Sequence, residues 1–185
     1  MQAIETIELT STQSSITFTS IPDTFTDLCI KLSVRSDEGS ASYDPLLFRY
    51  NGSTSGYSAR YLGAVVGSFT QSGTNTTATS ADATGTWGRT AAPGIPTSAH
   101  TANTFANVSI YIANYASSSN KSYSMDLVGE NNGTQNSLAI AAGLWNDTDA
   151  INEISFALKD GSFVQYSSAT LYGILAGDDG TTTVS

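Results

Sequence analysis

The chain has 185 residues, a mass of 19.3 kDa, a formal net charge of −9 and only 12% charged residues. This length suits one domain with a self-sufficient core, and two domains would be cramped. Its seven Lys and Arg residues are scattered, which argues against the clustered positive charge that nucleic acids and anionic membrane surfaces attract. Ser and Thr make up roughly a quarter of the sequence, so the polar surface is rich in hydroxyls rather than charges.

Two short alternating runs open the chain, Ile4–Leu9 and Ile16–Ile21, and the segment Thr10–Ser14 between them is typical of a turn. We expect these runs to form a hairpin. Met1–Thr10 lacks the basic and apolar regions of a signal peptide, and no run is long enough to span a bilayer. We therefore expect synthesis in a cytoplasm without export.

The segment Thr26–Ser36 has the clearest strand pattern. Branched aliphatic residues stand at every second position of this segment: Leu28, Ile30, Leu32 and Val34. This period of two predicts a strand with one buried face, while Lys31 and Arg35 stay near water. Cys29 cannot form an internal disulfide because it is the only cysteine, and we expect it to be a buried, inert thiol.

The next two segments also read as strands, and a long polar segment follows them. Leu46–Asn51 is apolar on much of both faces, and alternation resumes at Tyr57 and can run on to Phe69. Between Thr70 and Thr104 the apolar periodicity disappears into Ser, Thr, Gly, Asn and Ala. Loops longer than about 15 residues in a compact domain are usually functional or disordered, so this loop is the first place to look for partner contacts.

Three residues of this loop are candidates for such contacts. Trp87 stands beside Gly88 and Arg89, and Ile95 follows among small and polar residues. An aromatic side chain with an arginine is the composition of an interface anchor, so we expect Trp87, Arg89 and Ile95 to contact a neighbouring copy or another protein. The alternative is a loop that folds back over its own sheet, with Trp87 in a satellite cluster.

Five further strands are expected in the second half of the chain. They are Phe105–Tyr115, Tyr123–Leu127, Leu138–Trp145, Ile154–Leu158 and Ala169–Leu175. The third of them is almost wholly apolar and rich in Ala, which indicates a strand packed closely on both sides. Taken together, the sequence predicts one all-β domain over residues 1–176, an antiparallel β-sandwich that is jelly-roll-like, and a polar tail over 177–185.

Little in the sequence indicates catalysis or a cofactor. His100 is the only histidine, no nucleophile elbow is present, and one His with one Cys is too few for a zinc site. We therefore expect no enzyme activity, no cofactor and no metal. Two weaker alternatives stay open: a calcium site that uses Asp147 and Asp149, or Asp178 and Asp179, and a glycosidase pair among the sixteen acids.

Several blocks of the sequence, in this order, resemble a widespread family of small virion proteins of tailed phages. They are Ser20–Leu28, Leu32–Ser36, Phe48–Gly52, Tyr57–Leu62, Thr101–Phe105, Ile112–Tyr115, Ala142–Trp145 and Ala169–Ile174. The resemblance implies a phage structural protein with a β-sandwich fold, found either on capsids as decoration or cement protein or on tails and fibres. It implies no catalytic residues.

Within that family, the sequence favours a decoration or cement protein that binds the outside of the shell of major capsid protein and stabilises it. We expect the chain to be one domain without a separate tail-attachment module, and its sequence has no collagen-like repeat or coiled coil, parts that fibres usually have. We expect it in the virion as a homo-oligomer, a trimer, because one patch then serves every copy of a closed ring. The alternative is a tail-fibre or receptor-binding domain that recognises host glycans, and a glycan hydrolase ranks last.

Overall fold

The computed structural model describes residues 1–41, 43–65, 68–75, 88–89, 94–130 and 137–175. Within these ranges the chain forms fourteen β-strands and no helix, and thus no helix that could cross a membrane. The strands are β1 (Gln2–Glu8), β2 (Ser15–Phe18), β3 (Asp27–Val34), β4 (Tyr43–Asp44), β5 (Leu46–Tyr50), β6 (Tyr57–Val65), β7 (Ser68–Asn75), β8 (Gly88–Arg89), β9 (Ile95–Pro96), β10 (Ala106–Ile112), β11 (Lys121–Gly129), β12 (Ser137–Trp145), β13 (Ile154–Leu158) and β14 (Ser168–Ile174).

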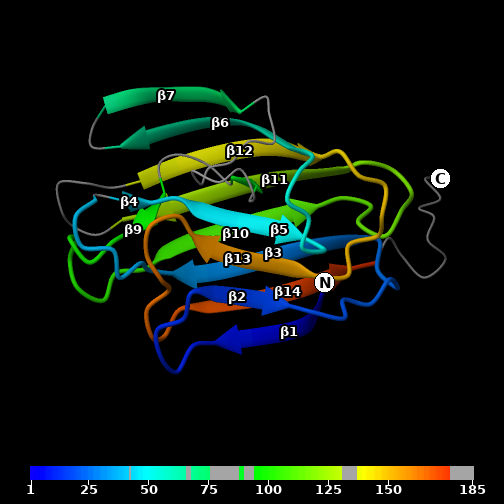
Figure 1. Cartoon of the computed structure of the whole chain (residues 1–185), viewed down its shortest axis with the longest axis horizontal. Coiled ribbons are helices and arrows are strands. Elements are labelled where there is room, and N and C mark those ends of the chain that lie inside the picture. The colour runs from blue at the N-terminus through cyan, green and yellow to red at the C-terminus, as the bar shows by residue number, and fades with distance from the viewer. Residues whose placement is uncertain (42, 66–67, 76–87, 90–93, 131–136, 176–185) are drawn as a thin grey trace, which may run out of the picture.

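The strands pack in two layers, and every described pairing is antiparallel (Figure 1). Eight strands form the large sheet in the order β1-β14-β3-β10-β11-β12-β6-β7, and four form the small sheet in the order β2-β13-β5-β8. The short strands β4 and β9 pair with each other. The expected antiparallel β-sandwich is thus confirmed.

The chain crosses repeatedly between the two sheets, which gives the sandwich its jelly-roll-like connections. It passes from β1 in the large sheet to β2 in the small sheet and back to β3, and it repeats this path over β12, β13 and β14. The expected hairpin of the first two strands is therefore wrong. β1 pairs with β14 and β2 with β13, because both find their partners near the end of the chain and the segment between them changes layers.

The central strand β3 has the inward face that the sequence predicted. Leu28, Ile30 and Val34 have no exposed area and Leu32 has 3%. The neighbouring strand β10 matches this face, with Ile110 opposite Ile30 across the pairing. Each such side chain contributes roughly 1.5–3 kcal/mol through its burial, so this pair of strands forms the centre of the core. Cys29 is buried, as expected, and burial raises the pKa of its thiol.

Arg35 does not stay near water, although the alternation predicted that it would. Its side chain is only 7% exposed, and its guanidinium donates hydrogen bonds to the backbone carbonyls of His100, Thr101 and Thr104 at 2.8–3.1 Å. The reason is that β3 ends at Val34, so the two-residue period no longer applies to Arg35. Lys31 lies within the strand and is exposed, as predicted.

An aromatic cluster fills one end of the space between the sheets. Its members are Phe48, Tyr50, Tyr57, Tyr123 and Trp145, with ring centroids 4.9–6.3 Å apart. Gly143 is part of the same packing, because a Cβ at that position would lie 2.1 Å from the Tyr123 ring. The tyrosines of this cluster therefore belong to the core. The distances between their ring centroids suit edge-to-face contact.

The long loop expected between Thr70 and Thr104 is partly built of strands. β7 continues the large sheet to Asn75, β8 adds to the small sheet, and β9 pairs with β4. The sequence pattern did not predict β7, because this strand has no apolar alternation. Backbone pairing with β6 holds it in the sheet, from Ser68 opposite Val65 to Asn75 opposite Ala59. The tail expected over 177–185 lies outside the described residues.

Candidate interaction surface

The outer face of the large sheet is the side turned away from the small sheet, and β12 shows its character most clearly. Ala139 and Ala141 point inward and are buried, whereas Leu138 and Ile140 point outward and are 51% and 57% exposed. The prediction that this strand is packed on both sides is therefore wrong. The small sheet covers one face of the large sheet, and small Ala side chains suffice on that side.

Four outward aliphatic side chains form one contiguous group, which we call the apolar patch: Leu62, Val128, Leu138 and Ile140. Ile140 lies opposite Leu62 on β6, and Leu138 lies opposite Val128 on β11. Side chains directly opposite each other on paired strands lie about 4.5–5.5 Å apart at Cβ, so these pairs are in contact range. The four side chains are 42–57% exposed, which is unusual for large aliphatic groups at the centre of a sheet.

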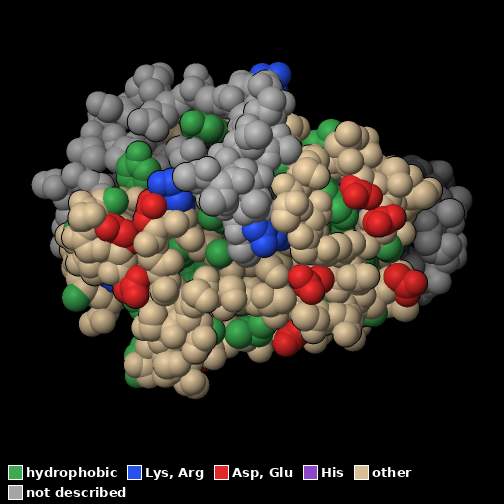
Figure 2. Space-filling model, viewed as in Figure 1, with side chains coloured by type: hydrophobic (Ala, Val, Ile, Leu, Met, Phe, Trp, Pro, Cys, Tyr) green, Lys and Arg blue, Asp and Glu red, His purple; other side chains and the backbone are tan. Residues whose placement is uncertain are grey.

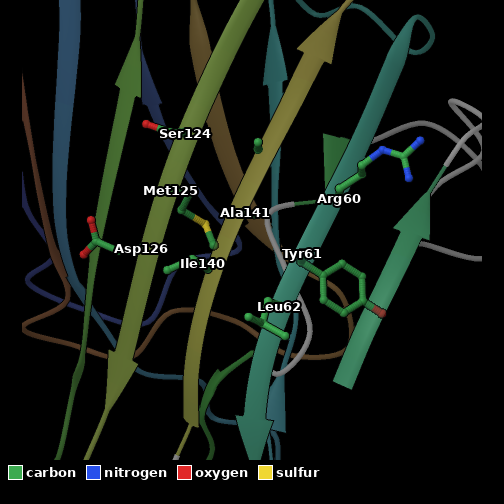
Figure 3. A pocket seen from close by; sticks show the side chains of 9 residues that line it. Arg60, Tyr61, Leu62, Ser124, Met125, Asp126, Ile140 and Ala141 are labelled. Carbon is green, nitrogen blue, oxygen red and sulfur yellow. The ribbon is translucent and has the colours of Figure 1, made fainter. Parts of the chain in front are cut away.

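Beside the apolar patch the sheet carries a broad hollow of about 580 Å³ (Figure 3). Its base is formed by small residues, Ala142 on β12 and Ser124 on β11, which lie opposite each other. Arg60 flanks it on β6 and extends toward β7, while Asp126 flanks it on β11, beyond Ile140. The hollow thus combines an aliphatic wall with one positive and one negative side chain on opposite flanks.

The outer face continues across β10 and β3 with polar side chains that are held in place. Tyr111 is 40% exposed, and its hydroxyl donates a 2.6 Å hydrogen bond to Asp27 Oδ2, which raises the pKa of that tyrosine. Lys31 Nζ donates to Ser109 Oγ at 2.6 Å. On the other side of the molecule, over the small sheet, acidic side chains are spread widely and hydrophobic ones appear in separate areas (Figure 2).

Of the three residues proposed from the sequence as partner contacts, the structure describes Arg89 and Ile95. Ile95 is fully buried in the chain's own core, so the folded-back alternative holds for this residue and its side chain offers no area to a partner. Arg89 lies in β8, where its backbone pairs with Leu47 of β5. Trp87 lies outside the described residues, and its contact stays a prediction.

Sequence reasoning missed the apolar patch, although the signal was present. Leu138 and Ile140 alternate with Ala139 and Ala141, which is the period of a strand with two different faces. All four residues are apolar, so the pattern looked like two buried faces. The size difference was the clue, because the smaller residues lie inward against the aromatic and aliphatic core.

Asp44 and Asp147 each accept hydrogen bonds from groups of the same chain. Asp44 is fully buried and accepts hydrogen bonds from Ser36 Oγ at 2.8 Å and from the backbone N–H groups of Asp160 and Gly161. Burial raises the pKa of this carboxyl, while these donors oppose the shift. Asp147 Oδ1 accepts from the N–H of Asp149, and within the described ranges no three His, Cys, Asp or Glu residues are placed to hold a metal ion.

Comparisons with protein-family models, with curated proteins and with solved structures found no match. The features that indicate a function are therefore those of the chain itself. They are the sandwich fold, the apolar patch with its charged flanks, and the order of the sequence blocks.

Proposed function

We propose that this chain is a structural protein of a tailed-phage virion, a decoration or cement protein that binds the outside of the shell of major capsid protein and stabilises it. The observation that carries the proposal is the exposed apolar patch on the large sheet. Soluble monomers rarely expose contiguous apolar groups without using them for binding. The order of sequence blocks that resembles phage virion proteins supplies the setting.

The chemistry of the apolar patch favours a protein partner over a glycan. Its four side chains are aliphatic and offer no hydrogen-bond donors or acceptors to sugar hydroxyls. Burial of such side chains against another protein is favourable by about 25 cal/mol per Å² of apolar area. The strands that carry them, β6, β11 and β12, are each paired on both sides, so the surface is held rigidly. A rigid aliphatic surface suits assembly more than the glycan recognition expected of a receptor-binding domain.

Stabilisation of a shell would follow from mass action. A protein that binds the assembled shell but not its dissociated subunits shifts the equilibrium toward the shell, by about 2.7 kcal/mol per site at a free concentration 100 times Kd. Interfaces of modest area then add up over the many sites of a particle. No chemical step is needed for this role.

Particles that lack the protein test the proposal. We expect them to lose resistance to heat and pressure while still adsorbing to host cells, and addition of the purified protein should restore the resistance. Normal resistance together with lost adsorption would overturn the proposal and support the tail-fibre or receptor-binding alternative. The add-back step is the control, because it separates loss of the protein from any effect on assembly during infection.

A further inference from the structure

We infer that the turn around Tyr166 binds a neutral glycan. This turn lies between β13 and β14, and the segment between β1 and β2 runs beside it. The inference goes beyond the proposed function and does not depend on it, because the turn is separate from the apolar patch. It is carried by the backbone conformation of Tyr166, by the exposure of its ring and by the chemistry of the side chains around it.

Tyr166 has a backbone conformation that its residue type disfavours. Its φ angle is 70°, in the left-handed region where a residue with a Cβ atom is strained. Hydrogen bonds of the backbone fix this conformation. The N–H of Tyr166 donates to the carbonyl of Leu9 at 2.8 Å, and the N–H of Ser167 donates to the carbonyl of Val164 at 3.1 Å. The turn therefore requires a positive φ whichever side chain occupies position 166.

Most positions of this kind in the chain carry a residue that tolerates them. Of the described residues other than glycine, five have a positive φ, and three of these are asparagine: Asn51, Asn103 and Asn114. Tyr166 is the only aromatic residue among the five. Its ring does not fill the core, because the residue is 65% exposed. An exposed aromatic side chain at a strained position indicates a contact outside the chain.

The side chains beside Tyr166 are polar and uncharged. Backbone hydrogen bonds of 2.8 and 3.0 Å between Gln13 and Phe163 hold the two segments together. The exposed neighbours in these segments carry hydroxyl or amide groups: Thr10, Ser11, Thr12, Gln13, Ser14 and Gln165. No charged residue occurs in residues 9–22 or 161–177, although the whole chain has a net charge of −9. The surface around the ring is therefore neutral and rich in hydrogen-bonding groups.

This chemistry fits a neutral sugar better than a protein or an acidic glycan. A pyranose has a face of C–H groups that packs on a tyrosine ring, and its hydroxyl groups exchange hydrogen bonds with amide and hydroxyl side chains. The centre of a protein interface is more apolar, and Val164, the one aliphatic residue of the turn, is half-buried. The net charge of −9 disfavours an acidic glycan.

The turn lies away from the apolar patch. β1 and β14 are the first two strands of the large sheet, whereas β11, β12 and β6 stand toward its other side (Figure 1). Neighbouring strands are about 4.8 Å apart, so β14 lies roughly 14 Å from β11 and roughly 24 Å from β6. A copy that is bound to a shell through the apolar patch can therefore hold a glycan at Tyr166 as well.

A glycan array followed by titration calorimetry of the full chain is the first test. The probes are neutral oligosaccharides of glucose, mannose, galactose and N-acetylglucosamine, with sialylated and sulfated glycans beside them. We expect the wild-type protein to bind a neutral oligosaccharide with a Kd on the order of 1 mM or below. We expect no binding of the acidic glycans.

Variants of two exposed tyrosines separate a contact from a structural role. Tyr166→Asn should weaken glycan binding about tenfold or more, as for a central contact residue. Its melting temperature should stay equal or rise, because asparagine tolerates a positive φ. Tyr111→Ser is the matched control, since Tyr111 is 40% exposed on β10 and its hydroxyl is bonded to Asp27. This control should lower the melting temperature and leave glycan binding unchanged.

Three results would overturn the inference: a folded wild-type protein that binds no neutral oligosaccharide, a Tyr166→Asn variant that binds as the wild type does, or a clear fall in the melting temperature of that variant. Normal glycan binding by Tyr166→Asn together with poor occupancy on capsids would assign the turn to a protein partner instead. Particle stability is measured separately, so the glycan site and the proposed function can each fail alone.

Discussion

Removing the hydroxyl from either of two neighbouring tyrosines in the aromatic cluster should change stability in opposite directions. Tyr50 is 1% exposed, and its hydroxyl oxygen has no hydrogen-bond partner among the described residues. The Tyr57 hydroxyl accepts a 2.9 Å hydrogen bond from the backbone N–H of Tyr50 and donates one of 3.3 Å to the carbonyl of Ser53. The two side chains are chemically identical and their rings are 6.0 Å apart, so each serves as the control for the other.

The magnitudes follow from these contacts. An unsatisfied buried hydroxyl costs about 1–3 kcal/mol, so Tyr50→Phe should raise the free energy of unfolding by about 1–2 kcal/mol, with the ring packing retained. Tyr57→Phe removes two hydrogen bonds and leaves the N–H of Tyr50 unsatisfied, so it should lower the free energy of unfolding by about 1–3 kcal/mol.

Urea unfolding of the two variants, followed by fluorescence, measures both changes. The slope of the free energy against urea should match that of the wild type, because neither change alters the area exposed on unfolding. If Tyr50→Phe is destabilising by about 1 kcal/mol or more with an unchanged slope, its hydroxyl has a partner and the reasoning is refuted. A neutral Tyr57→Phe would likewise show that its two hydrogen bonds contribute nothing.

Three further predictions follow from the core. Asp44→Asn should lower the free energy of unfolding by about 1–3 kcal/mol, because an amide N–H₂ group would face donors such as the N–H of Gly161. Urea unfolding measures this change, and an unchanged free energy would show that the Asp44 carboxylate does not stabilise the fold. Gly143→Ala should lower the melting temperature, because the new Cβ meets the Tyr123 ring at 2.1 Å, and a normal melting temperature would show that the ring moves freely. Burial raises the pKa of Tyr57 from 10 to about 12, so the stability this residue contributes should be complete below pH 10 and lost as the pH rises toward 12; melting curves that stay constant from pH 10 to 12 would refute this.

The fold class could be predicted from the sequence because β3 and β10 carry strict alternation that leaves one face for the core. The pairing of strands could not. β1 and β2 lie close in sequence but join different sheets, since their hydrogen-bonding partners come from the last strands of the chain. β7 has no apolar alternation, and it joins the sheet through backbone pairing with β6. Such long-range pairings depend on the whole sandwich, which a local pattern does not contain.

The candidate surface was less accessible to sequence reasoning than the core. Trp87, Arg89 and Ile95 stood out because they interrupt a polar segment, yet Ile95 proved to be a core residue. Leu138 and Ile140 went unnoticed because they lie among other apolar residues. Whether an aliphatic side chain on a strand faces the core or water depends on what covers each face of the sheet. The sequence around it does not specify that cover.

The number of copies of this protein in a purified virion tests the proposed function most directly. Quantitative mass spectrometry of particles from a phage that encodes the chain, with the major capsid protein as internal standard, gives that number. A decoration protein should be present on the order of hundreds of copies per particle, in a fixed ratio to the major capsid protein. A few to a few tens of copies would place it on the tail, and absence from the particle would contradict a structural role in the virion.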